Sequence, residues 1–219
     1  MIRCCIFDLD GTLLDTLDAL TYTTKLVMEH FGYGPVDREH VKQFVGDGYK
    51  MLMERALKYC GDEALTHYEE SLSVYTELFA KHSMYHVKPY DGIPELLETL
   101  KEKGIKIAVL SNKPHPRTVE NIEAVFGAGY FDYVAGEQPG VPRKPDPAGV
   151  KLILDRFGLK PEECLYFGDT NTDMKTGLGA GLVTAGVTWG FRDREELLSF
   201  HPQFVINHPL EILEKAKIQ

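Results

Sequence analysis

The sequence predicts an α/β protein built on a Rossmann-like parallel sheet covered by helices on both faces, with an inserted α-helical domain. Two observations carry this prediction. Short apolar runs alternate with stretches of helical spacing in residues 1–14 and again over residues 89–219, which is typical of parallel strands buried on both faces. Residues 15–88 contain helical patterns only. We therefore expect a Rossmann-like core from residues 1–14 and 89–219, and a helical insertion over residues 15–88.

The first predicted strand lies near the N-terminus. Residues 2–7 form a short apolar run that is followed by the polar sequence DLDGT, as expected for a buried strand ending in a turn. Apolar residues then recur at intervals of three and four over residues 17–31 and stop at Gly32, which predicts an amphipathic helix. Helical spacing continues over three further stretches of the insertion, at residues 41–45, 51–57 and 65–79.

Strands and helices alternate after residue 89. A helix is predicted over residues 94–103, and an apolar strand over residues 105–110 that ends at Ser111 and Asn112. Asp146 and Pro147 are typical of a helix start, and that helix is expected to stop at Gly158. The remaining predicted elements are a strand at 164–167, a short helix to Gly181, a strand at 182–187, a helix at 194–199, a strand at 204–206 and a last helix.

The composition is that of a soluble globular protein with an acidic charge balance. The 219 residues include 24 Lys and Arg against 33 Asp and Glu, a formal net charge of −9, and 43% are hydrophobic. This balance argues against bulk nucleic-acid binding and a basic membrane-surface patch. No stretch approaches the roughly 18 apolar residues of a membrane span, and Asp8 and Asp10 interrupt the only run that resembles a signal peptide. We expect no nucleic-acid or membrane partner, and a cytoplasmic location.

The cysteines support the same compartment. None of the four belongs to a CxxC pair, and two are adjacent in the first predicted strand, where neighbouring side chains point to opposite faces. They are therefore predicted to be small buried hydrophobic residues in a reducing environment. The four are Cys4, Cys5, Cys60 and Cys164.

Polar clusters follow three of the predicted strands, and a fourth lies in a loop that enters a helix. They are Asp8, Asp10 and Thr12; Ser111 and Asn112; Asp169 and Asp173; and the RKPD sequence that contains Lys144. Ligands of open parallel sheets bind outside the carboxyl ends of the strands, so all four clusters are expected to face one crevice. Four gathered aspartates would repel one another, a divalent cation would relieve this, and all-oxygen ligands favour Mg²⁺ over zinc. A lysine and a strand-end serine suit a phosphate group.

Four motifs, in this order, resemble those of the haloacid dehalogenase-like hydrolase superfamily. DLDGTL at residues 8–13 is similar to the first motif, Ser111-Asn112 to the second, Lys144 in RKPDP to the third, and GDTNTD at residues 168–173 to the GDxxxD form of the fourth. The resemblance covers the whole chain. It implies a phosphatase with Mg²⁺ as cofactor and a small phosphorylated metabolite as substrate.

The resemblance also implies a role for each motif residue. Asp8 would be the nucleophile that forms an aspartyl-phosphate, and Asp10 would protonate the leaving oxygen and then act as base on water. Mg²⁺ would be held by Asp8, by the carbonyl oxygen of Asp10, by Asp169, and by Asp173 directly or through water. The phosphate-binding set would be Ser111, Asn112, Lys144 and Thr12, with Ser111 and Lys144 on the phosphate oxygens and the other two supporting the loops.

The insertion resembles the helical cap of this superfamily, which closes over small soluble substrates. Residues 44–57, 89–92 and 186–190 resemble the corresponding segments of phosphoglycolate phosphatases, which favours 2-phosphoglycolate as substrate. Arg55 either meets a substrate carboxylate or is a structural helix charge. A β-phosphoglucomutase and a pyrophosphatase or nucleotidase of the same superfamily remain alternatives. A monomer or a homodimer is expected.

Two alternatives from a different class are weaker. A Mg²⁺-binding phospho-receiver module has neither the insertion nor the general-acid position that Asp10 occupies. A non-catalytic binding protein would have lost one of the four motifs, and none is lost.

Other features have mainly structural interpretations. The GLGAG sequence at residues 177–181 follows a helix and lacks the GxGxxG spacing, so close helix packing is expected. His82 and His86 are predicted to be a solvated pair, because no third metal ligand is evident. His115 follows the second motif and is a weaker candidate for substrate contact, and Trp189 is expected in the core or in a lid over the crevice.

Overall fold

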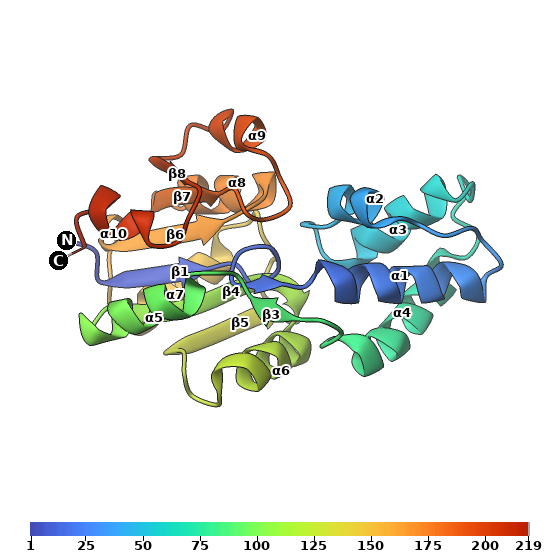
Figure 1. The fold of residues 1–219 in the computed structure, drawn as a ribbon, viewed down its shortest axis with the longest axis horizontal. Helices are drawn as coiled ribbons and strands as arrows, with labels where there is room; N and C mark the ends of the chain where they lie inside the picture. The colour runs from blue at the N-terminus through green and yellow to red at the C-terminus, as the bar shows by residue number, and fades with distance from the viewer. Residues whose placement is uncertain (219) are drawn as a thin grey trace. The chain divides into compact units, whose positions relative to one another are not determined.

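The computed structural model describes residues 1–218 (Figure 1). The chain divides into two compact units: one comprises Met1–Leu14 together with the chain from Pro89 onward, and the other comprises Asp15–Lys88. Each unit has its own set of secondary-structure elements. Among residues 1–218, no helix combines the length and the apolar character needed to cross a membrane.

The first unit is built on a six-stranded sheet in the order β5-β4-β1-β6-β7-β8, and every neighbouring pair is parallel. This confirms the predicted α/β class. The strands are β1 (Cys4–Phe7), β4 (Lys106–Pro114), β5 (Tyr133–Glu137), β6 (Cys164–Gly168), β7 (Val183–Val187) and β8 (Phe204–Ile206). The helices are α5 (Ile93–Glu102), α6 (His115–Phe126), α7 (Ala148–Phe157), the 3₁₀ turn η1 (Pro161–Glu163), α8 (Asn171–Gly179), α9 (Arg194–Leu198) and α10 (Glu211–Lys215).

The central strands bury side chains on both faces of the sheet. One face joins alternate residues of β1, β4 and β6, such as Cys4 and Ile6, with Val150 and Ile153 of α7. The intervening residues point to the opposite face, where Phe7 stacks on Phe167 of the neighbouring strand β6 with ring centroids 4.5 Å apart. This burial on both faces explains why the strands are continuous apolar runs in the sequence.

The cysteine prediction holds for three of the four residues. Cys4, Cys5 and Cys164 are fully buried in β1 and β6. Cys60 is only half-buried, so the prediction of burial was wrong for this residue. It caps the C-terminal end of a helix, where its Sγ lies 3.6 Å from the carbonyl oxygen of Gly34.

The end of β4 differs from the prediction. The strand was expected to end at Ser111 and Asn112, but it continues to Pro114, with a shift of register between Leu110 and Pro114 against β5. The predicted start of α7 is confirmed within two residues, because Pro147 is its N-cap and the Asp146 carboxylate accepts the Ala148 N–H at 2.8 Å.

In the first unit, α6, β5 and the short turn η1 were not predicted. Helix α6 has apolar residues at Val119, Ile122 and Phe126, spaced by three and four as in an amphipathic helix, so its sequence signal was present and was overlooked. In β5, Gly136 replaces an apolar side chain because a Cβ there would lie 2.5 Å from the carbonyl oxygen of Lys113 in β4. The glycine in β5 thus weakened the sequence signal of that strand.

Between its two ends, the second unit contains only helices and the loops that join them. They are α1 (Leu17–His30), α2 (Arg38–Phe44), α3 (Tyr49–Tyr59) and α4 (Tyr68–His82). Helix α1 ends before Gly32, as its spacing predicted. Two short strands that were not predicted, β2 (Leu14–Asp15) and β3 (Lys88–Pro89), pair with each other where the chain enters and leaves this unit.

Candidate active site

The register of the sheet brings the predicted motifs to one edge. Phe7 of β1 is level with Val109 of β4 and Phe167 of β6, so the residues that follow emerge side by side. The backbone N–H of Asp8 donates to the carbonyl oxygen of Phe167 at 2.9 Å, which fixes the start of the first motif against β6. Asp8 therefore lies at the carboxyl ends of the central strands, where open parallel sheets bind ligands.

Three carboxylates form a buried cluster at this edge. One carboxylate oxygen from each of Asp8, Asp169 and Asp173 lies within 4.8 Å of the others. The Nζ of Lys144 lies 2.9 Å from Oδ1 of Asp8 and 2.7 Å from Oδ1 of Asp173. The lysine side chain is buried as well, with 3% of its area exposed. A single lysine thus serves two of the three clustered acids.

Burial and mutual repulsion shift the protonation of this cluster. Burial raises the pKa of Asp8 from 3.8 to about 7; the charge of Asp173 adds to the rise and Lys144 opposes it. Burial also places the pKa of Asp169 well above its ordinary value, with further contributions from Asp173 and Asp8. For Lys144, burial acts to lower the pKa, but the charges of Asp173 and Asp8 outweigh it and raise the pKa well above 10.5. The lysine therefore remains charged, whereas Asp8 and Asp169 ionise less readily than ordinary carboxyl groups.

Asp169 is held by neutral donors from two other segments. The Thr12 hydroxyl donates to its Oδ1 at 2.8 Å, and the Phe191 backbone N–H donates to its Oδ2 at 2.8 Å. Two glycines make room for this carboxylate: a Cβ on Gly11 would lie 2.2 Å from Oδ2 of Asp169, and one on Gly190 would lie 2.4 Å from its Cβ. The Asp169 side chain is therefore fixed in position by its surroundings.

Asp173 is bonded through both of its oxygens. Its Oδ1 accepts from Lys144 Nζ and from the Tyr166 hydroxyl at 3.1 Å, and its Oδ2 accepts from the backbone N–H and the hydroxyl of Thr170. Thr170 is in turn the N-cap of α8 and completes a capping box with Asp173. The residue thus braces the helix start and the lysine together.

Asn112 positions the loop that carries Lys144. Its Nδ2 donates to the Lys144 carbonyl oxygen at 3.0 Å, and its Oδ1 accepts the Lys144 N–H at 2.9 Å. Ser111 and Asn112 are both buried, and the Ser111 Oγ accepts the backbone N–H of Lys113 at 3.2 Å. The second and third motifs are thereby joined through a reciprocal pair of hydrogen bonds.

Asp10 occupies a different environment from the other three aspartates. Its carboxylate is not part of the buried cluster; its Oδ1 lies 2.5 Å from the Nζ of Lys113. The side chain of Lys113 is 3% exposed and that of Asp10 is 20% exposed. Sequence reasoning missed Lys113, because a lysine that follows a predicted strand end is usually solvated.

The segment after β7, which contains Trp189 and Phe191, contacts the site more closely than the sequence predicted. Trp189 was expected in the core or in a lid, and its indole N–H donates to the carbonyl oxygen of Thr12 at 3.0 Å. Two residues later, Phe191 donates its backbone N–H to Asp169. This segment therefore connects the first and fourth motifs.

The remaining candidates have structural partners. Arg55 donates to the carbonyl oxygen of Phe44 and to the Asp47 carboxylate, both at 2.6 Å, which is the structural alternative foreseen for it. His115 accepts the Gly136 N–H at 3.2 Å through Nδ1. His86 stacks on Tyr85 and lies 3.4 Å from Asp18, while His82 packs edge-on against Tyr22. A Cβ on Gly177 would lie 2.5 Å from the Thr184 hydroxyl, in agreement with close helix packing.

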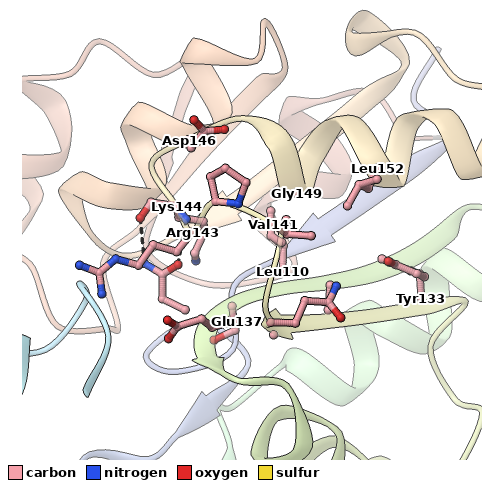
Figure 2. Close-up of a pocket in the computed structure, with 15 residues that line it drawn as sticks. Leu110, Tyr133, Glu137, Val141, Arg143, Lys144, Asp146, Gly149 and Leu152 are labelled. Atoms are coloured by element: carbon pink, nitrogen blue, oxygen red, sulfur yellow. Dashed lines mark hydrogen bonds between the residues drawn. The ribbon is translucent and has the colours of Figure 1, made fainter. Parts of the chain in front are cut away.

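A pocket borders the phosphate-binding candidates (Figure 2). Ser111, Asn112 and Lys144 line it, and Leu110, Val141, Gly149 and Leu152 give it an apolar lining. Figure 2 shows the side chains of Arg143 and Glu137 on one side of this pocket and those of Tyr133 and Leu152 on the other. The aspartates of the first and fourth motifs are not among its lining residues, so the pocket adjoins the carboxylate cluster and does not contain it.

Comparison with known proteins gives a consistent result. The model of the haloacid dehalogenase-like hydrolase family matches residues 5–187. The phosphoglycolate phosphatase of Aquifex aeolicus is 32% identical over 217 residues, which are 97% of this chain and 96% of that protein. Phosphoglycolate phosphatase 1 of Pseudomonas aeruginosa is 30% identical over 98% of this chain and 79% of its own length.

The fold has equally close counterparts among solved structures. The crystal structure of a candidate phosphoglycolate phosphatase from Lactobacillus delbrueckii subsp. bulgaricus gives a TM-score of 0.92 at 30% identity, over 97% of each chain. The family match spans well over half of the chain, and the relatives match nearly all of it. This confirms the resemblance that the four motifs indicated. The chain therefore belongs to the haloacid dehalogenase-like hydrolase family, in which it is a phosphatase similar to the phosphoglycolate phosphatases.

Proposed function

We propose that this protein is a Mg²⁺-dependent phosphomonoester hydrolase that acts through an aspartyl-phosphate intermediate on a small soluble phosphate ester, with 2-phosphoglycolate as its substrate. The observation that carries the proposal is the buried cluster of Asp8, Asp169 and Asp173, two of which contact a single buried lysine, Lys144. Such a site combines a nucleophilic carboxylate, a place for a cation and a fixed positive charge for phosphate. These are the parts that phosphoryl transfer requires.

The donor set fits Mg²⁺. When all four groups are ionised, the three carboxylates and the one ammonium have a summed charge of −2, which a divalent cation neutralises. The donors are all oxygens, the ligand type that Mg²⁺ prefers. We assign Asp8, Asp169 and the Asp10 carbonyl oxygen as ligands, and Asp173 as a further ligand, directly or through water. When bound, Mg²⁺ offsets negative charge between the nucleophile and the phosphate.

Asp8 is assigned as the nucleophile. A carboxylate oxygen of Asp8 attacks phosphorus, a new P–O bond forms, and the bond from phosphorus to the ester oxygen breaks. The leaving oxygen takes a proton from the carboxyl group of Asp10 and departs as an alcohol. For glycolate this proton is important, because an alkoxide is a poor leaving group.

Asp10 is assigned a second role in the hydrolysis of the intermediate. Its carboxylate takes a proton from a water molecule as that water attacks phosphorus. The bond between phosphorus and the Asp8 oxygen then breaks, which releases inorganic phosphate and restores both carboxyl groups to their initial states. The different environment of Asp10, outside the buried cluster, supports a proton-transfer role distinct from that of the other aspartates.

The phosphate-binding set is proposed to be Ser111, Asn112, Lys144 and Thr12. Lys144 brings a charge that stays positive in the buried site, and Ser111 offers a hydroxyl next to backbone amides. Asn112 and Thr12 act through their neighbours: Asn112 holds the Lys144 loop and Thr12 holds Asp169.

The substrate and the cell compartment are inferred by analogy. The proposal of 2-phosphoglycolate rests on the relatives that are phosphoglycolate phosphatases and match almost the full chain. We assign the helical unit over residues 15–88 as the cap that selects the substrate, and the remainder as the catalytic core. A metabolite of this kind is consistent with a cytoplasmic monomer or homodimer that has no nucleic-acid or membrane partner.

The proposal is tested by phosphate release with and without Mg²⁺ from 2-phosphoglycolate, pyrophosphate, nucleoside monophosphates and p-nitrophenyl phosphate, with the Asp8→Asn variant as the blank. We expect Mg²⁺-dependent turnover that strongly favours 2-phosphoglycolate and is absent in the variant. Preference for another ester with the same blank would replace the substrate and retain the mechanism. Turnover by Asp8→Asn would overturn the mechanism.

A further inference from the structure

The ion pair between Lys113 and Asp10 has no place in the steps described so far. The Nζ of Lys113 lies 2.5 Å from Oδ1 of Asp10, and 97% of the lysine side chain is removed from solvent. Burying an ammonium group is costly unless it is paired and hydrogen-bonded. The pair therefore determines where both side chains lie.

The backbone around Lys113 directs its side chain toward Asp10. The shift of register between Leu110 and Pro114 interrupts the regular pairing of β4 with β5 at this point, and irregularities of this kind re-aim side chains. The Lys113 N–H donates to the Ser111 hydroxyl at 3.2 Å, and its carbonyl oxygen accepts from the Thr118 hydroxyl at 3.1 Å. Gly136 permits the close approach of β5 to that same carbonyl. Hydrogen bonds to both its N–H and its carbonyl oxygen thus hold the backbone of Lys113 in place.

Asp10 needs such an anchor more than its neighbours do. Asp169 and Asp173 are each fixed by several hydrogen bonds, whereas the Asp10 carboxylate is part-exposed and stands outside the buried cluster. A group that transfers a proton must lie within hydrogen-bond reach of the atom it serves. The contact with Lys113 engages Oδ1 of Asp10 and so restricts the rotation of its carboxyl group.

We propose that Lys113 is the positioning residue for the proton-transfer carboxyl group of Asp10. This inference rests on the proposed function, because it assigns a partner to the acid and base of that same reaction. In this assignment Lys113 acts through Asp10.

The test compares two leaving groups in the first chemical step. Glycolate leaves from 2-phosphoglycolate only with a proton, while p-nitrophenolate is stable enough to leave without one. Both rates are measured in a single turnover with saturating Mg²⁺. Glycolate formation is followed by rapid quench and p-nitrophenol release by stopped flow. The variants are Lys113→Met, Lys113→Arg, Asp10→Asn and the Asp10→Asn/Lys113→Met double variant.

In Lys113→Met we expect glycolate formation to slow by about 100-fold, the lower range for a lost general acid, while the p-nitrophenol burst stays within about threefold of wild type. Lys113→Arg, which can still pair with Asp10, should recover most of the glycolate rate. In the Asp10→Asn background, adding Lys113→Met should change neither rate, because the residue that Lys113 positions is already disabled.

Lys106→Met is the matched control. Lys106 lies at the other end of β4 and pairs with Asp132 at 2.6 Å, so this variant removes a more exposed lysine–aspartate pair from the same strand, away from the site. It should leave both rates unchanged.

Three outcomes would overturn the inference: equal slowing of both leaving groups, no slowing of either, or a full additional effect of Lys113→Met in the Asp10→Asn background. Absence of hydrolysis in the wild-type protein would instead refute the proposed function, and the role of Lys113 with it. Activity of the wild-type protein therefore distinguishes a failure of the proposed function from a failure of the role assigned to Lys113.

Discussion

The hydroxyl of Thr12 donates a hydrogen bond of 2.8 Å to Oδ1 of Asp169, across 157 positions of the sequence. Thr12 follows β1 and Asp169 follows β6, so this bond joins the first and fourth motifs at the edge of the sheet. Trp189 adds a second connection from the loop after β7, through the carbonyl oxygen of Thr12. The metal-ligand candidate Asp169 is therefore held by a threonine of the first motif, which the loop after β7 contacts in turn.

Replacing Thr12 by valine should weaken both the fold and metal binding. The variant keeps the shape of the side chain but leaves Oδ1 of buried Asp169 without this donor, which should reduce the free energy of unfolding by about 1–3 kcal/mol. The stabilising effect of Mg²⁺ on the thermal unfolding midpoint should also require higher Mg²⁺ concentrations. Thr12→Ser keeps the hydroxyl and should behave like wild type. An unchanged Mg²⁺ titration in Thr12→Val would contradict the role of this bond.

The close approach at Gly11 can be separated from its backbone conformation. Gly11 and Gly32 both have positive φ, +84° and +74°, but a Cβ on Gly32 has nothing within 4 Å, while one on Gly11 would lie 2.2 Å from Oδ2 of Asp169. Gly32→Ala should therefore cost only the roughly 1–2 kcal/mol of a left-handed alanine. Gly11→Ala should cost more by about 1–3 kcal/mol, through overpacking, and should remove most phosphate release.

Urea unfolding and phosphate assays on these two alanine variants supply the comparison. Equal stability losses, or an active Gly11→Ala enzyme, would show that Asp169 can move away without consequence.

The metal-free protein should lose stability as the pH rises from about 4 to about 7. The pKa of Asp8 is raised from 3.8 to about 7 in the folded state, mainly by burial. In this window the folded protein therefore binds a proton at Asp8 that the unfolded chain has released, and folding becomes less favourable as that proton is lost. Asp8→Asn lacks this effect and should be more stable than wild type at pH 8 in EDTA.

Urea unfolding of both proteins at pH 5 and pH 8, with EDTA or with Mg²⁺, measures this difference. Mg²⁺ should restore wild-type stability at pH 8 and do less for the variant. A variant less stable than wild type at pH 8 in EDTA would refute the electrostatic account of the cluster.

A second carboxyl group should give the opposite pH dependence in the helical unit. The backbone N–H of His67 holds the pKa of Asp62 down to about 2, with the backbone N–H and hydroxyl of Thr66 contributing. Its stabilising contribution is therefore present above the ordinary pKa near 3.8 and is lost as the pH falls toward 2. The stability difference between wild type and Asp62→Asn should shrink when the pH is lowered from 5 to 3. A difference that stays constant or grows between pH 5 and pH 3 would contradict this account.

The sequence predicted the parts of the site that are encoded by residue type. The apolar run Cys4–Phe7 ends abruptly at Asp8, and this contrast indicates a buried strand followed by a candidate catalytic residue. The same contrast identifies Asp169 after β6. The parallel sheet then follows from the alternation of such strands with helices, and the comparisons with known proteins agree with it.

Other parts of the site could not be predicted, because their positions depend on packing. Lys113 looks solvent-exposed in the sequence, and only the irregular end of β4 turns it toward Asp10. Phe191 contributes a backbone N–H to Asp169, a group that every residue except proline carries, so its side chain gave no signal.

The central claim is that Asp8 carries the phosphoryl group, and trapping the intermediate tests it most directly. The enzyme is quenched with acid during turnover of 2-phosphoglycolate with Mg²⁺, and the acyl phosphate is reduced with borohydride and mapped by peptide mass spectrometry. The account predicts homoserine at position 8, absent when substrate is omitted and absent in Asp8→Asn. The account would be contradicted if the enzyme turned over but position 8 remained aspartate after reduction. It would also be contradicted if homoserine appeared at any other aspartate.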